Sequence, residues 1–274
     1  MSGAPAVIEL RRSGQRFLTR AAGVQSRHSF AFGAHHDPDN VRYGPLLVHN
    51  EDVIQPGAGY PIHAHRDLEI LTWVLSGSMV HEDENGDAHL VTAGQLQRIS
   101  AGTGIRHTER NAEPAHDTPP SAAPPSTAPP SAVPPPALRP VHLVQMWLDP
   151  GQYGGEPSYQ RVDASEHLRS GLLVPIAGGD AARRPVAGQL RTPRVGLSVA
   201  RLEPGDVVVV PAAAMIHLFL ARGHVVIQGD GETRGEGLLR SCRLGAGDAL
   251  RLRQHSNLGV IAQQSSELLV LELG

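Results

Sequence analysis

Short apolar runs separated by Gly, Pro, Asn and Asp recur along almost the whole chain, and helical periodicity is scarce. Runs of this kind, bounded by turn residues, are typical of β-strands, and many of them in one chain favour a sandwich or a barrel. The length of 274 residues is enough for two ordinary domains or for one large barrel. The sequence therefore predicts an all-β protein.

The predicted strands fall into two groups. Those of the first half are residues 7–10, 29–32, 46–53, 70–75, 79–83, 89–92, 95–100, 107–110 and 141–148. Those of the second half are residues 194–202, 207–211, 216–221, 224–228 and 267–273. The dipeptide Asn85-Gly86 predicts a hairpin turn. Similar turns precede strands in both halves, at 92–94, 203–206 and 245–248, which indicates a duplicated architecture whose second copy lost its chemistry.

The composition changes abruptly between residues 113 and 140, where Pro, Ser and Ala dominate. Such a segment has little to bury and lacks many backbone donors, so we expect a solvated, partly polyproline II loop. A partner-binding PxxP role is the less favoured reading. We interpret the segment as an insertion before the last strand of the first domain. The predicted domains are therefore residues 1–152 and 153–274.

Charge and cysteine content restrict the partners and the compartment. A net charge of −3 and the lack of a basic run argue against a nucleic-acid or membrane surface. Cys242 is the only cysteine, which excludes an intrachain disulfide and fits a reducing compartment. We expect it to be an ordinary half-buried thiol. No signal-peptide core or transmembrane run is present, so the sequence predicts a cytoplasmic protein.

Two pairs of side chains carry the spacing of a metal site. His63 and His65 are two residues apart, so on an extended strand both imidazoles point to the same side. His107 and Glu109 repeat that spacing. Two such pairs on neighbouring strands would supply three imidazoles and one carboxylate, a ligand set suited to iron, nickel, cobalt, copper, manganese or zinc. The sequence therefore predicts one metal site.

The second half contains no His-x-His or His-x-Glu pair, so we expect no metal ligands there. Isolated histidines are usually structural or solvated. We assign ten histidines to loops, surface or packing: His35, His36, His81, His89, His116, His142, His167, His217, His224 and His255. Trp73 and Trp147 are predicted to fill the core.

The glycine positions around these pairs resemble the two cupin motifs. The first resemblance runs through Gly57, His63, His65, Glu69 and Gly77, and the second covers residues 94–111. Three features depart from the usual pattern: Gly77 comes one residue late, Ser100 replaces a proline, and the gap before His107 is longer. The run His-x-His-Arg-Asp-x-Glu, followed by Ser-Ala-Gly-Thr-Gly-Ile-Arg-His-Thr-Glu, is similar to the pirin family of bicupins, especially its bacterial quercetinase-like members. The resemblance covers residues 28–111 and 141–162.

This resemblance implies a bicupin with two jelly-roll-like β-barrel domains and a metal only in the N-terminal one. It implies His63, His65, His107 and Glu109 as the ligands. Many other cupins use instead the glutamate that matches Glu69. On a straight strand Glu69 would lie about 13 Å beyond His65, so the chain would have to turn sharply to bring it to the metal. We therefore expect Glu109 to be the ligand and Glu69 to be a neighbouring or pocket group.

The resemblance also implies an activity. The first hypothesis is a quercetin 2,3-dioxygenase-like oxidoreductase that cleaves a small aromatic substrate such as a flavonol, with Fe(II) as the expected ion and nickel, cobalt, copper, manganese or zinc as alternatives. Glu109 would take the proton of the flavonol hydroxyl. The alternative is a non-enzymatic metal- or redox-sensing regulator that acts through a protein partner, and a third is another cupin reaction such as an isomerisation. Turnover with consumption of oxygen separates these hypotheses, while the physiological metal, the substrate and the oligomeric state stay open.

Overall fold

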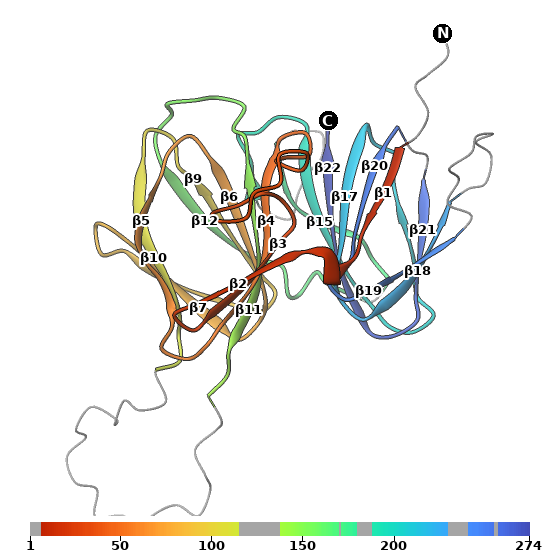
Figure 1. Cartoon of the computed structure of the whole chain (residues 1–274), viewed down its shortest axis with the longest axis horizontal. Coiled ribbons are helices and arrows are strands. Elements are labelled where there is room, and N and C mark those ends of the chain that lie inside the picture. Colours follow the sequence, from red (N-terminus) through yellow and green to blue (C-terminus); the bar gives the residue numbers. More distant parts are fainter. Residues whose placement is uncertain (1–6, 115–137, 170, 180–187, 230–240, 255–256) are drawn as a thin grey trace, which may run out of the picture.

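The computed structural model describes residues 7–114, 138–169, 171–179, 188–229, 241–254 and 257–274. These residues form two β-lobes that lie side by side (Figure 1). The elements of the first half are β1 (Val7–Arg11), the 3-10 turn η1 (Ser13–Gln15), β2 (Phe17–Ala21), β3 (Val24–His28), β4 (Leu46–Ile54), β5 (Gly59–His65), β6 (Glu69–Ser76), β7 (Ser78–Asp83), β8 (Ala88–Thr92), β9 (Gln95–Ser100), β10 (Ile105–Asn111) and β11 (Val141–Leu148). Those of the second half are β12 (Ser158–Asp163), β13 (Val174–Gly178), β14 (Gly188–Gln189), β15 (Val195–Leu202), β16 (Val207–Val210), β17 (Met215–Arg222), β18 (His224–Gly229), β19 (Cys242–Gly245), β20 (Ala249–Arg253), β21 (Leu258–Ala262) and β22 (Ser266–Leu273).

Each lobe combines a seven-stranded and a four-stranded sheet. In the first lobe the sheets are β12-β9-β6-β11-β4-β3-β2 and β5-β10-β7-β8. In the second they are β1-β20-β17-β22-β15-β13-β14 and β16-β21-β18-β19. The two orders correspond, except that β13 and β14 pair in parallel where β3 and β2 pair antiparallel, so the chain is a duplicated pair of β-barrels. This confirms the predicted all-β bicupin architecture.

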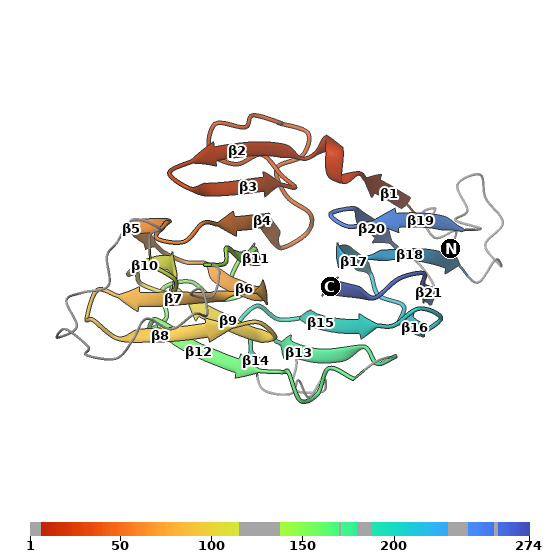
Figure 2. The same ribbon diagram turned by 90° about the horizontal axis from the view of Figure 1, so that it is seen from below.

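The two halves exchange one strand each. β1 begins the first half but pairs along its whole length with β20 of the second lobe. β12 begins the second half but pairs along its whole length with β9 of the first. Figure 2 shows β1 beside β20 and β12 beside β9. With a boundary between residues 152 and 153, each exchanged strand lies in the barrel formed mainly by the other half of the sequence. We expected β11 to be the last strand of the first domain, but β12 also joins its sheet.

The seven-stranded sheets of the two lobes share a hydrophobic core. Trp73 of β6 is fully buried in it, together with Phe219 and Leu271 of the second lobe. The indole Nε1–H of Trp73 donates to Glu267 Oε1 of β22 over 2.7 Å. The prediction that Trp73 fills the core is confirmed, and the core that it fills lies between the lobes.

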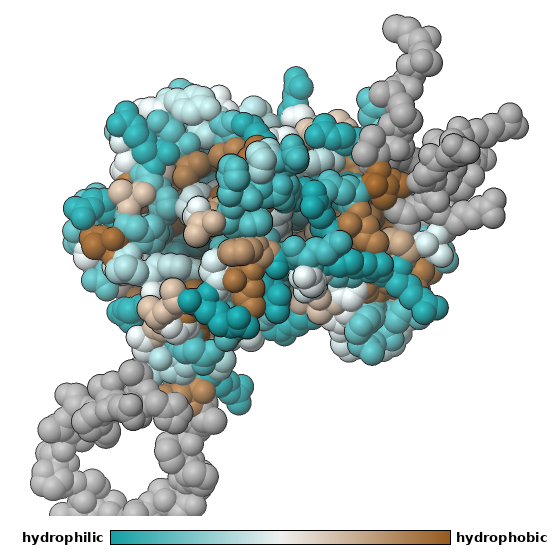
Figure 3. Space-filling view, in the orientation of Figure 1, coloured by the Kyte–Doolittle hydropathy of each residue, from teal (hydrophilic) through white to brown (hydrophobic). Residues whose placement is uncertain are grey.

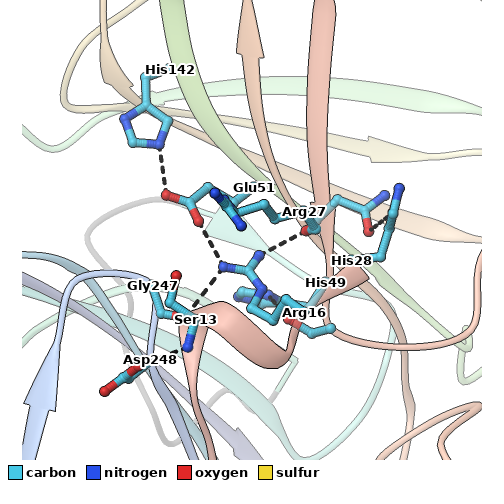
Figure 4. A network of polar contacts seen from close by, with 11 residues as sticks. Ser13, Arg16, Arg27, His28, His49, Glu51, His142, Gly247 and Asp248 are labelled. Carbon is cyan, nitrogen blue, oxygen red and sulfur yellow. Dashed lines mark hydrogen bonds and ion pairs between the residues drawn. The ribbon is translucent and has the colours of Figure 1, made fainter. Parts of the chain in front are cut away.

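The connection between β1 and β2 is held by both lobes (Figure 4). The buried guanidinium of Arg16 donates to Glu51 Oε2 of the first lobe at 2.7 Å and to the Gly247 carbonyl of the second at 3.3 Å. His142 lies 2.9 Å from the other carboxylate oxygen of Glu51. Desolvation by burial lowers the pKa of Arg16. The carboxylate of Glu51 stabilises the guanidinium charge and partly offsets this lowering. Arg16 thus fixes the exchanged segment at the interface.

Two imidazoles meet inside this interface. His49 of β4 and His217 of β17 are fully buried with ring centroids 4.6 Å apart. Burial is the first cause that holds the pKa of both rings well below the usual value. The nearby charges of Arg16 and Arg251 lower both further, and His217 also lowers the pKa of His49. His217 was predicted to be an isolated histidine, either structural or solvated. It is structural, but it packs against a second histidine across the interface.

We expect these rings to make the protein sensitive to acid. The unfolded chain takes up a proton on each ring near pH 6.5 while the folded chain does not, so stability is lost as the pH falls below about 6.5. The loss should approach about 1.4 kcal/mol per pH unit for each ring. His217→Leu, which inserts the residue found at the equivalent Leu71, should weaken this slope by the contribution of one ring. Urea unfolding at several pH values measures it, and an unchanged slope would contradict the assignment.

One predicted strand is wrong. Residues 29–32 form no strand, because the chain leaves β3 at His28 and turns through an isolated bridge between Phe32 and His35. The apolar side chain of Phe30 is buried between the lobes. Residues 115–137 of the predicted Pro-rich insertion lie outside the described residues.

The described part of the chain contains no helix with the length and apolar character needed to cross a bilayer. Polar residues dominate the face shown in Figure 3, and the apolar side chains on it form small separate groups. Scattered apolar residues of this kind are ordinary on a globular surface.

Candidate metal centre

β5 and β10 bring the two predicted pairs together. β5 is extended, so His63 and His65 point into the first barrel with ring centroids 4.8 Å apart. β10 lies antiparallel beside it, and His107 stands directly opposite His63. The spacing of two residues within each pair and the pairing of the strands therefore produce the convergence that the sequence predicted.

A β-bulge adds a further side chain to the site. The register of β5 and β10 shifts between His107 and Glu109, so that Glu109 pairs with Tyr60. Tyr60 and His63 are an odd number of residues apart, and a regular strand would place them on opposite faces. Because of the bulge, both line the same cavity.

A tight turn at Gly102 leads the chain into β10. Gly102 has φ +48°, and a Cβ atom there would lie 1.9 Å from the Gly155 carbonyl oxygen. Only glycine fits this close approach. Gly102, one of the glycines within residues 94–111, is therefore required by packing in the loop that positions His107.

Three imidazoles form the centre of the site. The ring centroids of His63 and His107 are 4.4 Å apart, and those of His65 and His107 are 5.1 Å apart. One ring nitrogen from each of the three lies within 4.8 Å of the others. His107 Nε2 is buried and has no hydrogen-bond partner. An orphaned buried nitrogen among three converging imidazoles is what a metal ion would complete.

Glu109 lies beside His107 with its carboxylate held in a fixed orientation. Gln97 Nε2 donates to one oxygen at 2.7 Å and Gln145 Nε2 to the other at 2.9 Å. The indole Nε1–H of Trp147 in turn donates to Gln145 Oε1 at 2.8 Å. Glu109 belongs with His107 and His81 to a second group of candidate ligands, so His107 joins the two groups. Each carboxylate oxygen keeps a lone pair for a further partner.

Two of the imidazoles, those of His65 and His107, have a lowered pKa. Burial, and then the neighbouring rings, lowers the pKa of His65 to about 4, and the same two causes lower that of His107 to about 4. Metal ligation requires a deprotonated imidazole nitrogen. The lowered pKa of His65 and His107 therefore favours metal binding over protonation, and three imidazoles with one carboxylate are a donor set that fits a divalent transition metal.

Glu69 lies outside the group of candidate metal ligands. It is fully buried, and its carboxylate accepts hydrogen bonds from Ser100 and from the backbone amides of Arg191 and Thr192 at 2.7 and 3.1 Å. It belongs to neither ligand group and does not line the cavity. The expectation of a pocket group is wrong, because the chain turns this carboxylate towards a loop of the second half.

A cavity of about 300 Å³ opens onto the site. Its lining combines three aromatic rings with small and polar side chains: Thr19, Ser26, His28, Phe32, Gly33, Ala34, Asn50, Tyr60, His63, Glu109, Gln145 and Trp147. A pocket of this volume takes a small organic ligand. Trp147 is half-buried here, edge-on to His65 at 4.8 Å, so its predicted place in the core is wrong.

Asp52 lies behind the cavity wall. Its carboxyl group is buried, which raises its pKa to about 6, while hydrogen bonds from Ser26 and Tyr60 oppose that rise. Both of these partners line the cavity. A group beside the cavity therefore changes its protonation state close to neutral pH.

Sequence reasoning missed the position of His81. We assigned it to the surface or to packing, but it is 1% exposed and its Nδ1 lies 3.1 Å from Nδ1 of His107. The signal was present in β7, where Met79 and His81 alternate with more exposed residues and so share the inward face. By contrast, His35 does lie in a loop, as predicted, stacked on Phe17 at 4.4 Å.

The second barrel has aliphatic residues where the first has ligands. Strand order and register make Val210, Leu258 and Val260 equivalent to His63, His107 and Glu109. All three belong to the apolar core of that barrel. Among the described residues, both groups of candidate metal ligands lie in the first barrel.

Comparisons with known proteins agree with this architecture. The Pirin family model matches residues 10–148. A protein of Mycobacterium tuberculosis with the provisional name quercetin 2,3-dioxygenase is 38% identical over 98% of this chain and 96% of its own. The quercetin 2,3-dioxygenase of Escherichia coli K12 is 36% identical over 57% of each chain. The crystal structure of the Escherichia coli bacterial pirin YhhW in complex with nickel(II) superposes with a TM-score of 0.77 at 27% identity, covering 97% of this chain and 99% of the other. The chain belongs to the pirin family.

Proposed function

We propose that this protein is a metal-dependent dioxygenase that cleaves flavonols in the manner of quercetin 2,3-dioxygenase. His63, His65, His107 and Glu109 would hold one divalent ion, with Fe(II) expected and nickel, cobalt, copper, manganese or zinc as alternatives. The observation that carries the proposal is the aromatic-walled cavity that ends at His63 and Glu109. The names of the related proteins point to the same reaction class.

When bound, the ion would supply Lewis acidity and redox chemistry for dioxygen. The residues of the chain would do the rest. Phe32 and Trp147 lie edge to face with centroids 5.4 Å apart and offer apolar surface to a planar aromatic substrate. Glu109, oriented by Gln97 and Gln145, would take the proton of the flavonol 3-hydroxyl. The aromatic rings of Phe32, Tyr60 and Trp147 would limit the access of water to the reacting centre.

The test is turnover of quercetin after loading the protein with each candidate metal in turn. We expect oxygen uptake together with release of carbon monoxide. Glu109→Gln should lower kcat by about 100-fold or more, the usual contribution of a positioned base. Glu113→Gln, which alters an exposed glutamate just beyond β10, is the matched control and should leave turnover unchanged.

A Glu109→Gln protein that binds metal and keeps full turnover would contradict the role of Glu109. A wild-type protein that binds metal without consuming oxygen would contradict the dioxygenase proposal and favour a metal-sensing regulator. In that case the readout to seek is a metal-dependent change in affinity for a protein partner.

A further inference from the structure

His81 lies directly behind one of the proposed metal ligands. It faces the interior of the first barrel from β7, opposite Glu109 in the register of β7 and β10. Its Nδ1 is 3.1 Å from Nδ1 of His107, and both side chains are 1% exposed. Two imidazole nitrogens at this distance share one proton, so one ring donates and the other accepts.

The remaining contacts decide which ring donates. His107 Nε2 is buried without a partner among the converging imidazoles. A metal ligand must present a lone pair there, which places the proton of His107 on Nδ1. His63 is arranged in the same way, because its Nδ1 lies 2.8 Å from the Pro61 carbonyl oxygen, which can only accept. In both rings Nδ1 is bonded to the protein and Nε2 is left for the ion.

We infer that His81 is a positioning residue of the metal centre, which accepts the Nδ1–H of His107 and so fixes the ring and the tautomer in which His107 Nε2 binds the ion. The inference rests on the proposed function, since it needs His107 to be a ligand. Partners of this kind hold metal-bound imidazoles in many proteins, and their removal weakens metal binding about 10- to 100-fold.

The exchanged strand holds His81 in place. Tyr159 of β12 stacks on the ring of His81 with centroids 4.8 Å apart, and on His89 at 4.3 Å. β12 begins the second half of the sequence and completes the sheet of the first barrel. Tyr159, which comes from the second half of the sequence, therefore packs against the residue that orients the ligand.

The duplication supports this role. Ile227 of β18 occupies the position equivalent to His81, opposite Val260, in the barrel that lacks the ligands. Ile227 is fully buried in the apolar core there. The second barrel thus lacks both the metal ligands and the imidazole that would orient one of them.

The competing reading makes His81 a ligand, because His81, His107 and Glu109 also form a group within 4.8 Å. His107 would then turn Nδ1 to the ion and leave Nε2 without a partner. If His81 is a ligand, its replacement removes one coordinated nitrogen from the ion. If His81 only orients His107, the number of coordinated nitrogens stays the same. A spectroscopic count of coordinated nitrogens therefore distinguishes them.

The experiment compares Cu(II) and Ni(II) affinities, measured by chelator competition, for the full-length wild-type protein and four variants. His81→Ile inserts the residue of the second barrel and should weaken binding about 10- to 100-fold. His81→Asn keeps an acceptor near the place of Nδ1 and should recover most of that loss. Tyr159→Leu should weaken binding less than His81→Ile. His89→Ala, which removes a neighbouring imidazole without contact to His107, should bind as the wild type does.

Electron paramagnetic resonance of the Cu(II) forms provides the second readout. We expect the same number of nitrogen couplings in wild type and His81→Asn, and the loss of one coupling in His81→Asn would overturn the inference in favour of direct ligation. If the wild-type protein binds metal and His81→Ile binds it with the same affinity, the inference is overturned and the proposed function is not. A wild-type protein that binds no metal would overturn the proposed function, and the inference with it. If His81→Ile does not fold, His81→Asn and Tyr159→Leu decide the question.

Discussion

His107→Leu is expected to abolish stable metal binding while leaving the fold intact. His107 contributes the shortest ring separation in the cluster, 4.4 Å to His63, and it joins the two groups of candidate ligands. Removing a ligand should cost more than removing an orienting partner, so we expect affinity to fall by more than about 100-fold. Leucine is the residue at the equivalent Leu258, which is buried in the second barrel, so the barrel should accommodate it.

Metal affinity and circular dichroism of the variant measure this effect. The matched control is His167→Leu, because His167 is exposed and remote in sequence from the ligands. A His107→Leu protein that folds and binds metal as tightly as the wild type would show that the imidazole is not a ligand.

Glu69→Ala is expected to have the largest effect on stability and none on metal affinity. Removal of the buried Glu69 carboxylate leaves three donors without their acceptor: the backbone amides of Arg191 and Thr192 and the hydroxyl of Ser100. Loss of a buried carboxylate with several donors should cost roughly 3–5 kcal/mol of unfolding free energy. Urea unfolding measures it, with the exposed Glu166→Ala as the control.

The same variant also tests the choice between the two glutamates. If Glu69 were the carboxylate ligand, Glu69→Ala would lose metal affinity in the folded protein and Glu109→Ala would not. We expect the opposite pattern, because Glu69 is committed to the loop at residues 191–192.

Much of the fold follows from local patterns in the sequence. β9 (Gln95–Ser100) and β11 (Val141–Leu148) have the bounds that the sequence predicted. Turn residues mark these bounds, because Gly94 directly precedes β9 and Asp149-Pro150-Gly151 directly follows β11. The exchange of β1 and β12 could not be predicted in this way, because the partner of an edge strand depends on contacts between residues far apart in sequence.

In the candidate site, too, local spacing predicts some features, whereas others depend on contacts between distant residues. The spacing of His63 with His65 predicts a shared face, since that follows from the two-residue period of a strand. The bulge that brings Tyr60 inward changes the period and leaves no clear signal in the sequence. Trp147 was placed in the core because of its size, but its contact with the cavity depends on which edge of the barrel is open.

The central claim is that three imidazoles and one carboxylate of the first barrel bind a single metal ion. Elemental analysis of the purified protein after loading and desalting tests it most directly, in wild type and in His107→Leu. We predict one divalent transition-metal ion per chain in the wild type and far less than one in the variant. A wild type that retains no metal, or a variant that retains as much as the wild type, would contradict the claim.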